Sequence, residues 1–232
     1  MIERFLVQAS SYAEDIDFLF TLITLIVGIW FLIAEGIFLF FIVRFRRKEG
    51  VKAAYITGEE KSQKKWISYP HMLVIVCDIV LIVGTMMVWN KVKVSLPEAD
   101  ETIRVISQQW AWTFVQPGPD GKLDTEDDIA TVDELHVREG TVYHFELESK
   151  DVVHSFSIPV FRLKQDAVPG RTITGWFEPI ITGEFDIQCA EMCGIGHALM
   201  PARISIESEE DHKKWMASQA GNKSAASIAV AR

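Results

Sequence analysis

Two long apolar runs near the start of the chain constrain its fold most strongly. Phe18–Val43 spans 26 residues with one charge, Glu35, and so exceeds the roughly 20 apolar residues that a helix needs to cross the hydrocarbon core. His71–Trp89 spans 19 residues with one acid, Asp78, and ends on a tryptophan, a residue type enriched at membrane interfaces. Each run therefore predicts a membrane-spanning helix.

The charges that flank these runs predict their orientation. The connection Arg44–Lys65 carries eight Lys or Arg residues, whereas the first 17 residues carry one. By the positive-inside rule the connection is cytoplasmic, and the N-terminal tail and everything from about residue 92 onward lie on the outer face. The first run follows an acidic stretch and is longer than the apolar part of a signal peptide, so we expect it to remain in the mature protein.

The two acids inside the runs, Glu35 and Asp78, are expected to face other protein, water or a proton path, because an unpaired carboxylate is costly at that depth. Protonated side chains hydrogen-bonded between helices fit the sequence. A proton-handling role fits it equally well.

The region after the second run predicts an all-β domain. Short stretches rich in Val, Ile, Thr and aromatic residues alternate with Gly, Pro and Asp turns, which is typical of a Greek-key sandwich or barrel of about 120 residues. Helical signal is confined to Ser208–Gln219, where a serine cap precedes acids. We therefore expect a transmembrane hairpin with a short outer tail and a basic cytoplasmic loop over 1–92, a β-domain over 93–218 and a flexible tail over 219–232.

The predicted outer region carries the acidic excess behind the net charge of −9. An acidic surface attracts a basic diffusing partner and argues against nucleic acid. Residues 118–129 place five acids in one loop, where calcium is conceivable because clustered carboxylates supply hard oxygen ligands. The EF-hand spacing is absent, so a solvated acidic loop is the favoured interpretation.

The stretch Cys189–Met200, CAEMCGIGHALM, gathers two cysteines, a histidine and a methionine. A disulfide between its cysteines would close so short a loop that it restricts the unfolded chain little, and it would leave the histidine and methionine unexplained. Zinc could take two thiolates and two imidazoles, with His154 as the second, but it has no use for a thioether. Copper suits thiolate, imidazole and thioether together.

The second cysteine points to more than one copper ion. A cupredoxin-type site takes a single thiolate, so a blue copper centre would leave one cysteine over. Two copper ions bridged by both sulfurs would use the two cysteines, with one imidazole on each ion and Met200 completing one of them. Sharing one unpaired electron over two metals changes each bond length little on reduction, which favours fast electron transfer. The disulfide and zinc interpretations remain as alternatives.

The chain resembles subunit II of haem-copper respiratory oxidases of the cytochrome c oxidase type. Cys189–Met200 is similar at every position to that family's binuclear copper loop, Cys-x-Glu-x-Cys-x3-His-x2-Met. Asp151–Pro159 resembles the strand with the first histidine ligand, Leu163–Arg171 the segment after it, and Gln108–Trp112, QQWAW, the aromatic motif near the copper centre. The family's layout of two spans and an outer cupredoxin-like domain covers nearly the whole chain.

The resemblance implies two copper ions and a role for each matched residue. Trp110 would be the residue at which electrons enter from cytochrome c. Glu191 would donate its backbone carbonyl to copper, and its carboxylate would reach a magnesium ion shared with subunit I. The copper ligands that the resemblance implies are His154, Cys189, Glu191, Cys193, His197 and Met200.

Two positions depart from the family pattern. Ala111 stands where the family usually has a tyrosine between two tryptophans, so the motif at Gln108–Trp112 has one aromatic side chain fewer than in the family. Gln63 stands where the family commonly has a glutamate a few residues before the Trp66–Pro70 motif. In the family that acid serves the mouth of a proton channel, so the resemblance does not carry this role over to the chain. The candidate substitutes are Glu59, Glu60 and Asp78.

The expected function follows from the resemblance and from one missing motif. The sequence holds no Cys-x2-Cys-His site for a covalent haem, so the electron donor is expected to be a separate cytochrome c or small copper protein. The chain is expected to be an oxidase subunit that passes electrons to haem in subunit I, where oxygen reduction is coupled to proton translocation. We expect further membrane subunits and a bacterial plasma membrane rather than a mitochondrial one. The alternatives are the copper subunit of a haem-copper nitric oxide reductase and a stand-alone membrane-anchored copper-binding protein.

Overall fold

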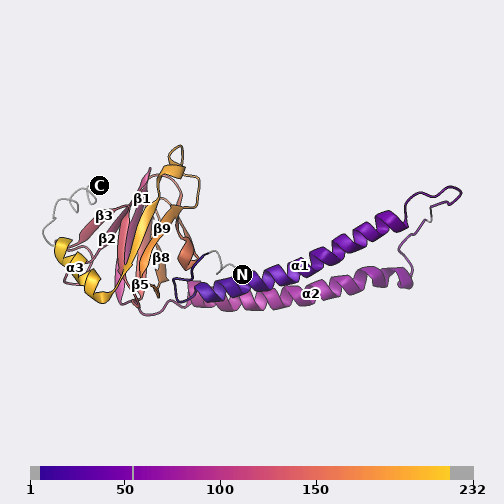
Figure 1. Cartoon of the computed structure of the whole chain (residues 1–232), viewed down its shortest axis with the longest axis horizontal. Coiled ribbons are helices and arrows are strands. Elements are labelled where there is room, and N and C mark those ends of the chain that lie inside the picture. Colours follow the sequence, from indigo (N-terminus) through magenta and orange to yellow (C-terminus); the bar gives the residue numbers. More distant parts are fainter. Residues whose placement is uncertain (1–5, 54, 220–232) are drawn as a thin grey trace. The chain divides into compact units, whose positions relative to one another are not determined.

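The computed structural model describes residues 6–53 and 55–219, and it divides the chain into two compact units (Figure 1). One unit is Asp17–Trp89. The other combines the chain up to Ile16 with the chain from Asn90 onward. The part of the predicted tail at 220–232 lies outside the described residues, and the predicted domain boundaries stay predictions.

The two predicted helices make up most of the first unit, although the first four residues of one of them belong to the other unit. Helix α1, Ala13–Arg44, has 32 residues and α2, Lys61–Trp89, has 29, and a π-helical turn, η2, continues α2 over Asn90–Val94. At about 1.5 Å per residue, each helix exceeds the roughly 30 Å of hydrocarbon in a bilayer. Within the described ranges these are the two helices long and apolar enough to cross a membrane. The most apolar part of each helix is not buried by the rest of the chain.

Two side-chain contacts illustrate how the helices of this unit meet. The indole nitrogen of Trp30 lies 3.4 Å from the sulfur of Cys77. Leu19 packs closely on Gly84, so that a Cβ added to the glycine would lie 3.3 Å from Cδ2 of the leucine. The side chains of Glu35 and Asp78 are exposed and make no ion pair or hydrogen bond to any residue in the described ranges. Their expected contact with a partner, water or a proton path stays a prediction.

The second unit is a sandwich of two five-stranded sheets, as the predicted fold class requires. The sheet orders are β3-β2-β1-β5-β8 and β4-β10-β9-β6-β7, and in each sheet one pair is parallel, β1 with β5 and β4 with β10. The remaining pairs are antiparallel. The strands are β1 Glu101–Gln108, β2 Ala111–Gln116, β3 Ile129–Val132, β4 Glu134–Arg138, β5 Tyr143–Ser149, β6 His154–Ile158, β7 Leu163–Ala167, β8 Ile173–Phe177, β9 Gly183–Cys189 and β10 Ala202–Glu207.

Alternating side chains on the strands form the core between the sheets. On β5, every second residue from Tyr143 to Leu147 is fully buried. Phe145 of that strand packs edge-to-face on Phe156 of β6, with ring centroids 5.6 Å apart, and so joins the two layers. Gly175 of β8 lies opposite Phe145 in the register, and a side chain there would collide with the ring. Burial of each such side chain contributes about 1.5–3 kcal/mol.

The segment before α1 belongs to this β-rich unit. The backbone N–H of Ala9 donates to the carbonyl of Val160 at 2.9 Å. Tyr12 is fully buried, packs edge-to-face on Trp176 and donates its hydroxyl to the Trp176 carbonyl at 3.2 Å. The segment predicted as a short outer tail is therefore, from residue 6 onward, a packed part of the β-unit.

The predicted C-terminal helix forms as α3, Glu209–Gln219. Its serine cap is confirmed, because the N–H of Asp211 donates to Ser208 Oγ at 3.2 Å. Glu207 of β10 fastens the helix to the sheet: its carboxylate lies 2.7 Å from Nδ1 of His136 and 2.9 Å from Nδ1 of His212.

We expect the burial of His212 to make the stability of the β-unit depend on pH. Burial lowers the pKa of His212 from 6.5, against the opposing effect of Glu207. The unfolded chain therefore binds the proton more readily, so the stabilisation is fully present above about pH 6.5 and is lost as the pH falls towards the lowered value. Thermal unfolding followed by Trp fluorescence measures this effect. Between pH 7.5 and 5, the midpoint temperature should fall more steeply in the parent chain than in His212→Gln. His144→Gln is the control and should keep the parent slope.

Candidate metal centre

The loop between β9 and β10 supplies most of the predicted ligands. It starts at Cys189, the last residue of β9, and contains one 3-10 turn, η4, at His197–Leu199. The N–H of Ala190 donates to the carbonyl of Ser155 at 3.0 Å, which fixes the start of the loop beside β6. Because β6 begins at His154, strand pairing brings a histidine from a distant part of the sequence to the loop.

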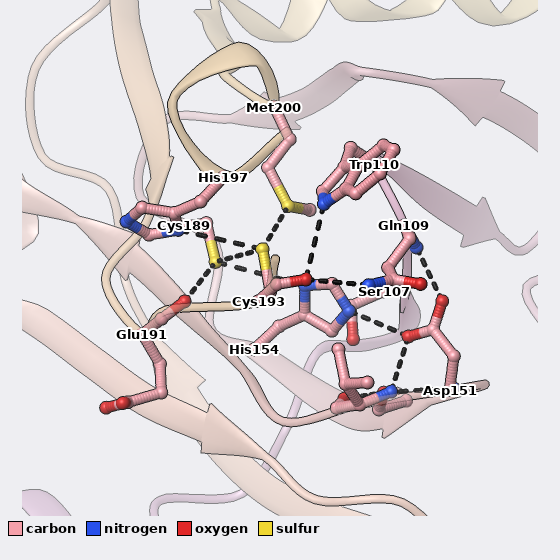
Figure 2. Close-up of polar contacts among 12 residues, drawn as sticks. Ser107, Gln109, Trp110, Asp151, His154, Cys189, Glu191, Cys193, His197 and Met200 are labelled. Atoms are coloured by element: carbon pink, nitrogen blue, oxygen red, sulfur yellow. Dashed lines mark hydrogen bonds and ion pairs between the residues drawn. The ribbon is translucent and has the colours of Figure 1, made fainter. Parts of the chain in front are cut away.

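Three side chains converge at this point. Nδ1 of His154 lies 3.9 Å from the sulfur of Cys189, and the sulfurs of Cys189 and Cys193 are 3.7 Å apart (Figure 2). All three ligand atoms lie within 4.8 Å of one another, and this is the one such group of three or more His, Cys, Asp or Glu side chains within the described ranges. Both cysteines are free, and their separation far exceeds the 2.05 Å of a disulfide. The geometry does not support the disulfide alternative.

The remaining predicted ligands surround the same sulfurs. The sulfur of Cys193 lies 3.6 Å from Nδ1 of His197 and 3.4 Å from the sulfur of Met200. The carbonyl oxygen of Glu191 lies 3.2 Å from the sulfur of Cys189. Figure 2 shows the carboxylate of Glu191 turned away from the sulfurs. The six predicted ligands thus lie around one point, and their roles as ligands stay a prediction.

Three of the six predicted ligands are buried, and the other three, Cys189, Glu191 and His197, are half-buried. His154 is fully buried, and the exposed fractions of Cys193 and Met200 are 2% and 1%. Burial, and after it the adjacent Cys189, raise the pKa of Cys193 to about 11. At ordinary pH the thiol is therefore neutral unless a cation stabilises the thiolate.

The histidine at the start of β6 is held in a defined orientation. Nε2 of His154 lies 2.9 Å from Oδ1 of Asp151, so this nitrogen donates to the carboxylate and Nδ1 is left facing the sulfurs. The fully buried Trp112 packs edge-on against the imidazole and donates its indole N–H to the Met200 carbonyl at 3.2 Å. Asp151 therefore orients the imidazole of His154, and Trp112 holds the part of the loop that carries Met200.

The turn between β1 and β2 lies against the loop. Trp110 is 38% exposed and donates its indole N–H to the carbonyl of Cys193 at 3.3 Å. Gly196 packs directly on the indole ring, where any side chain would collide. The predicted site of electron arrival is thus a surface residue in hydrogen-bond contact with a buried cysteine.

Sequence reasoning missed two polar residues of the site, Gln109 and Asp151. Gln109 donates its side-chain amide to Cys193, and Asp151 holds His154. Gln109 and Cys193 are 84 residues apart, so no local spacing could reveal the pair. The only available signal was a carboxylate three residues before a candidate ligand, which could have suggested support for His154.

The acidic loop at 118–129 lies outside this centre. Arg104 pairs with its Asp124 through two hydrogen bonds of 2.8 and 3.1 Å. No three acid groups of the loop, within the described ranges, come close enough to form a metal-binding group. This arrangement is compatible with the solvated acidic loop favoured from the sequence, and calcium binding by the loop stays a prediction.

The chain is similar to known proteins of one family. Residues 101–208 match the family model described as "Cytochrome C oxidase subunit II, periplasmic domain". The chain is 33% identical over 200 residues to "Alternative cytochrome c oxidase subunit 2" of Bradyrhizobium diazoefficiens, which covers 77% of this chain and 70% of the relative. It is 31% identical over 234 residues to "Probable cytochrome c oxidase subunit 2" of Rickettsia bellii, with coverages of 91% and 81%.

A solved structure is also similar. The crystal structure of the periplasmic domain of cytochrome oxidase subunit II from Bradyrhizobium japonicum is 32% identical in sequence. The match covers 56% of this chain and 99% of that one, with a TM-score of 0.49.

Proposed function

Because this chain belongs to the cytochrome c oxidase subunit II family, we propose that it is the subunit at which electrons enter a terminal respiratory oxidase. It takes electrons one at a time from cytochrome c or a small copper protein and passes them to haem in subunit I. Oxygen is reduced there, with proton translocation, so the chain is one component of an oxidoreductase.

The observation that carries this proposal is the set of donors around the sulfur of Cys193. A second cysteine, the imidazole of His197 and the thioether of Met200 lie within 3.7 Å of it. His154 and the carbonyl of Glu191 contact the other sulfur. Two thiolates, two imidazoles, a thioether and a carbonyl suit a pair of copper ions, whereas zinc leaves the thioether unused. When bound, such a pair supplies a one-electron redox couple.

The chain itself holds the ligands in place and buries three of them, His154, Cys193 and Met200. Asp151 orients His154, and Trp112 holds the loop at Met200, so the ligands need little rearrangement between oxidation states. Trp110 offers an aromatic surface to the donor and reaches Cys193 through one hydrogen bond. The acidic charge of the chain favours a basic donor.

The placement of the subunit follows from the same observations. Two apolar helices and a periplasmic-domain match support a membrane-anchored chain whose C-terminal domain lies on the outer face. We assign it to a bacterial plasma membrane, beside subunit I and further membrane subunits. The Glu191 carboxylate, turned away from the sulfurs, is free to reach a magnesium ion shared with subunit I.

Metal analysis and spectroscopy of the complex purified through this chain test the proposal. We expect two copper ions per chain, a purple product, and an EPR signal from one spin shared equally by two copper nuclei. A colourless zinc protein or a blue one-copper centre would contradict the metal assignment. A chain that purifies without a haem-bearing partner would contradict the oxidase assignment, and turnover with nitric oxide in place of oxygen would support the reductase alternative.

A further inference from the structure

The carbonyl groups of the loop between β9 and β10 point in two directions. The carbonyl of Glu191 faces the sulfur of Cys189 at 3.2 Å. The carbonyl of Cys193 instead accepts two hydrogen bonds from the β1–β2 turn, from Nε2 of Gln109 at 2.8 Å and from the indole of Trp110 at 3.3 Å (Figure 2). One carbonyl is therefore presented to the metal centre and the other is held by the turn.

The backbone of the loop does not fix this choice by itself. The residue after Cys193 is Gly194, at φ +117°, and glycine has unusual freedom to rotate the adjoining peptide plane. The Gln109 amide packs so tightly here that a Cβ on Gly194 would lie 2.8 Å from it. The shorter of the two hydrogen bonds to this carbonyl comes from Gln109, which makes it the main restraint on the peptide plane.

Gln109 is itself held by the partner of His154. Its backbone N–H donates to Oδ2 of Asp151 at 2.6 Å, while Oδ1 of the same carboxylate binds Nε2 of His154 at 2.9 Å. A continuous path of hydrogen bonds thus joins His154, on β6, to Cys193, in the loop, through Asp151 and Gln109. This path links side chains from three separate parts of the sequence.

We propose that Gln109 is a positioning residue that holds the Cys193 carbonyl away from the metal, so that the Glu191 carbonyl alone completes the centre. The inference rests on the proposed copper function. Without the amide donor, the Cys193–Gly194 peptide can rotate, and its carbonyl becomes a competing ligand. The partial positive charge of the Gln109 amide N–H, which lies near Cys193, would also favour the reduced state of the copper centre over the oxidised state.

The test compares Gln109→Leu and Gln109→Glu with the parent in the purified full-length complex. Both variants lose the amide that donates to the Cys193 carbonyl, and Gln109→Glu also places a negative charge beside that carbonyl. Loss of a hydrogen bond that supports a metal ligand typically weakens metal binding by about 10–100-fold. We therefore expect copper transfer to a chelator to be favoured by at least about tenfold, the EPR hyperfine pattern to change, and the reduction potential to fall in the order parent, Leu, Glu.

Gln108→Leu is the matched control, because Gln108 is the last residue of β1, directly before Gln109, and its side chain makes no hydrogen bond to any described residue. It should retain the parent spectrum, potential and copper affinity. If Gln109→Leu behaves like this control while the parent binds two copper ions, the inference is wrong and the proposed function stands. If the parent itself binds no copper, both fail. Should Leu impair assembly, the near-isosteric Gln109→Glu still gives the spectral and potential readouts.

Discussion

Replacing His154 with alanine is expected to eliminate the two-copper EPR signal. The imidazole is fully buried, and its Nδ1 lies 3.9 Å from the sulfur of Cys189, to which it comes from outside the loop. Its removal leaves an open coordination position and a cavity beside Trp112, so the sulfurs lose the geometry for two bridged ions. Copper analysis and EPR of the purified complex measure the loss.

Cys193→Ser should have the same consequence by another route. The sulfur of Cys193 lies within 3.7 Å of donor atoms of three other predicted ligands, and a hydroxyl is a poor substitute for a bridging thiolate. Cys77→Ser is the matched control, because Cys77 lies in helix α2 and its sulfur accepts a hydrogen bond from Trp30. All three variants should reach the membrane at parental level. A normal copper spectrum in His154→Ala or Cys193→Ser would refute the ligand assignment.

Replacing Trp110 with leucine should slow electron arrival while leaving the copper centre intact. The indole is partly exposed, and buried or partly buried Trp residues at the centre of an interface typically contribute at least about 2 kcal/mol to binding. That value corresponds to about a 30-fold loss in kcat/KM for the donor, since each 1.4 kcal/mol is tenfold. Steady-state oxidation of reduced cytochrome c measures it.

The spectrum separates a role in electron arrival from a role in packing. Gln109 still holds the Cys193 carbonyl in Trp110→Leu, so the EPR signal and copper content should match the parent. Trp215→Leu is the control, because Trp215 stacks on His136 at the α3 end of the β-unit. Equal loss of donor oxidation in both variants, or none in Trp110→Leu, would contradict the assignment.

Local patterns predicted much of the fold. The two helices follow from apolar runs whose lengths match a bilayer, and α3 follows from a serine cap at Ser208. The stretch Gln108–Trp112 was harder, because it lacks Gly or Pro and yet turns between β1 and β2. Core packing, with Trp112 buried and Trp110 outside, determines that turn, and periodicity does not reveal it.

By itself the sequence determined that a loop near the C-terminus carries two cysteines, a histidine and a methionine. Their short separations keep the four side chains close in any compact loop, so the kind of chemistry could be read directly. Only the tertiary structure decided what completes the centre. Pairing of β6 with β9 brings His154 to the loop, and the β1–β2 turn places Gln109 on Cys193. The segment around Tyr12 likewise joins a domain that starts some 80 residues later. Such contacts depend on how whole sheets pair and pack, and no short spacing encodes them.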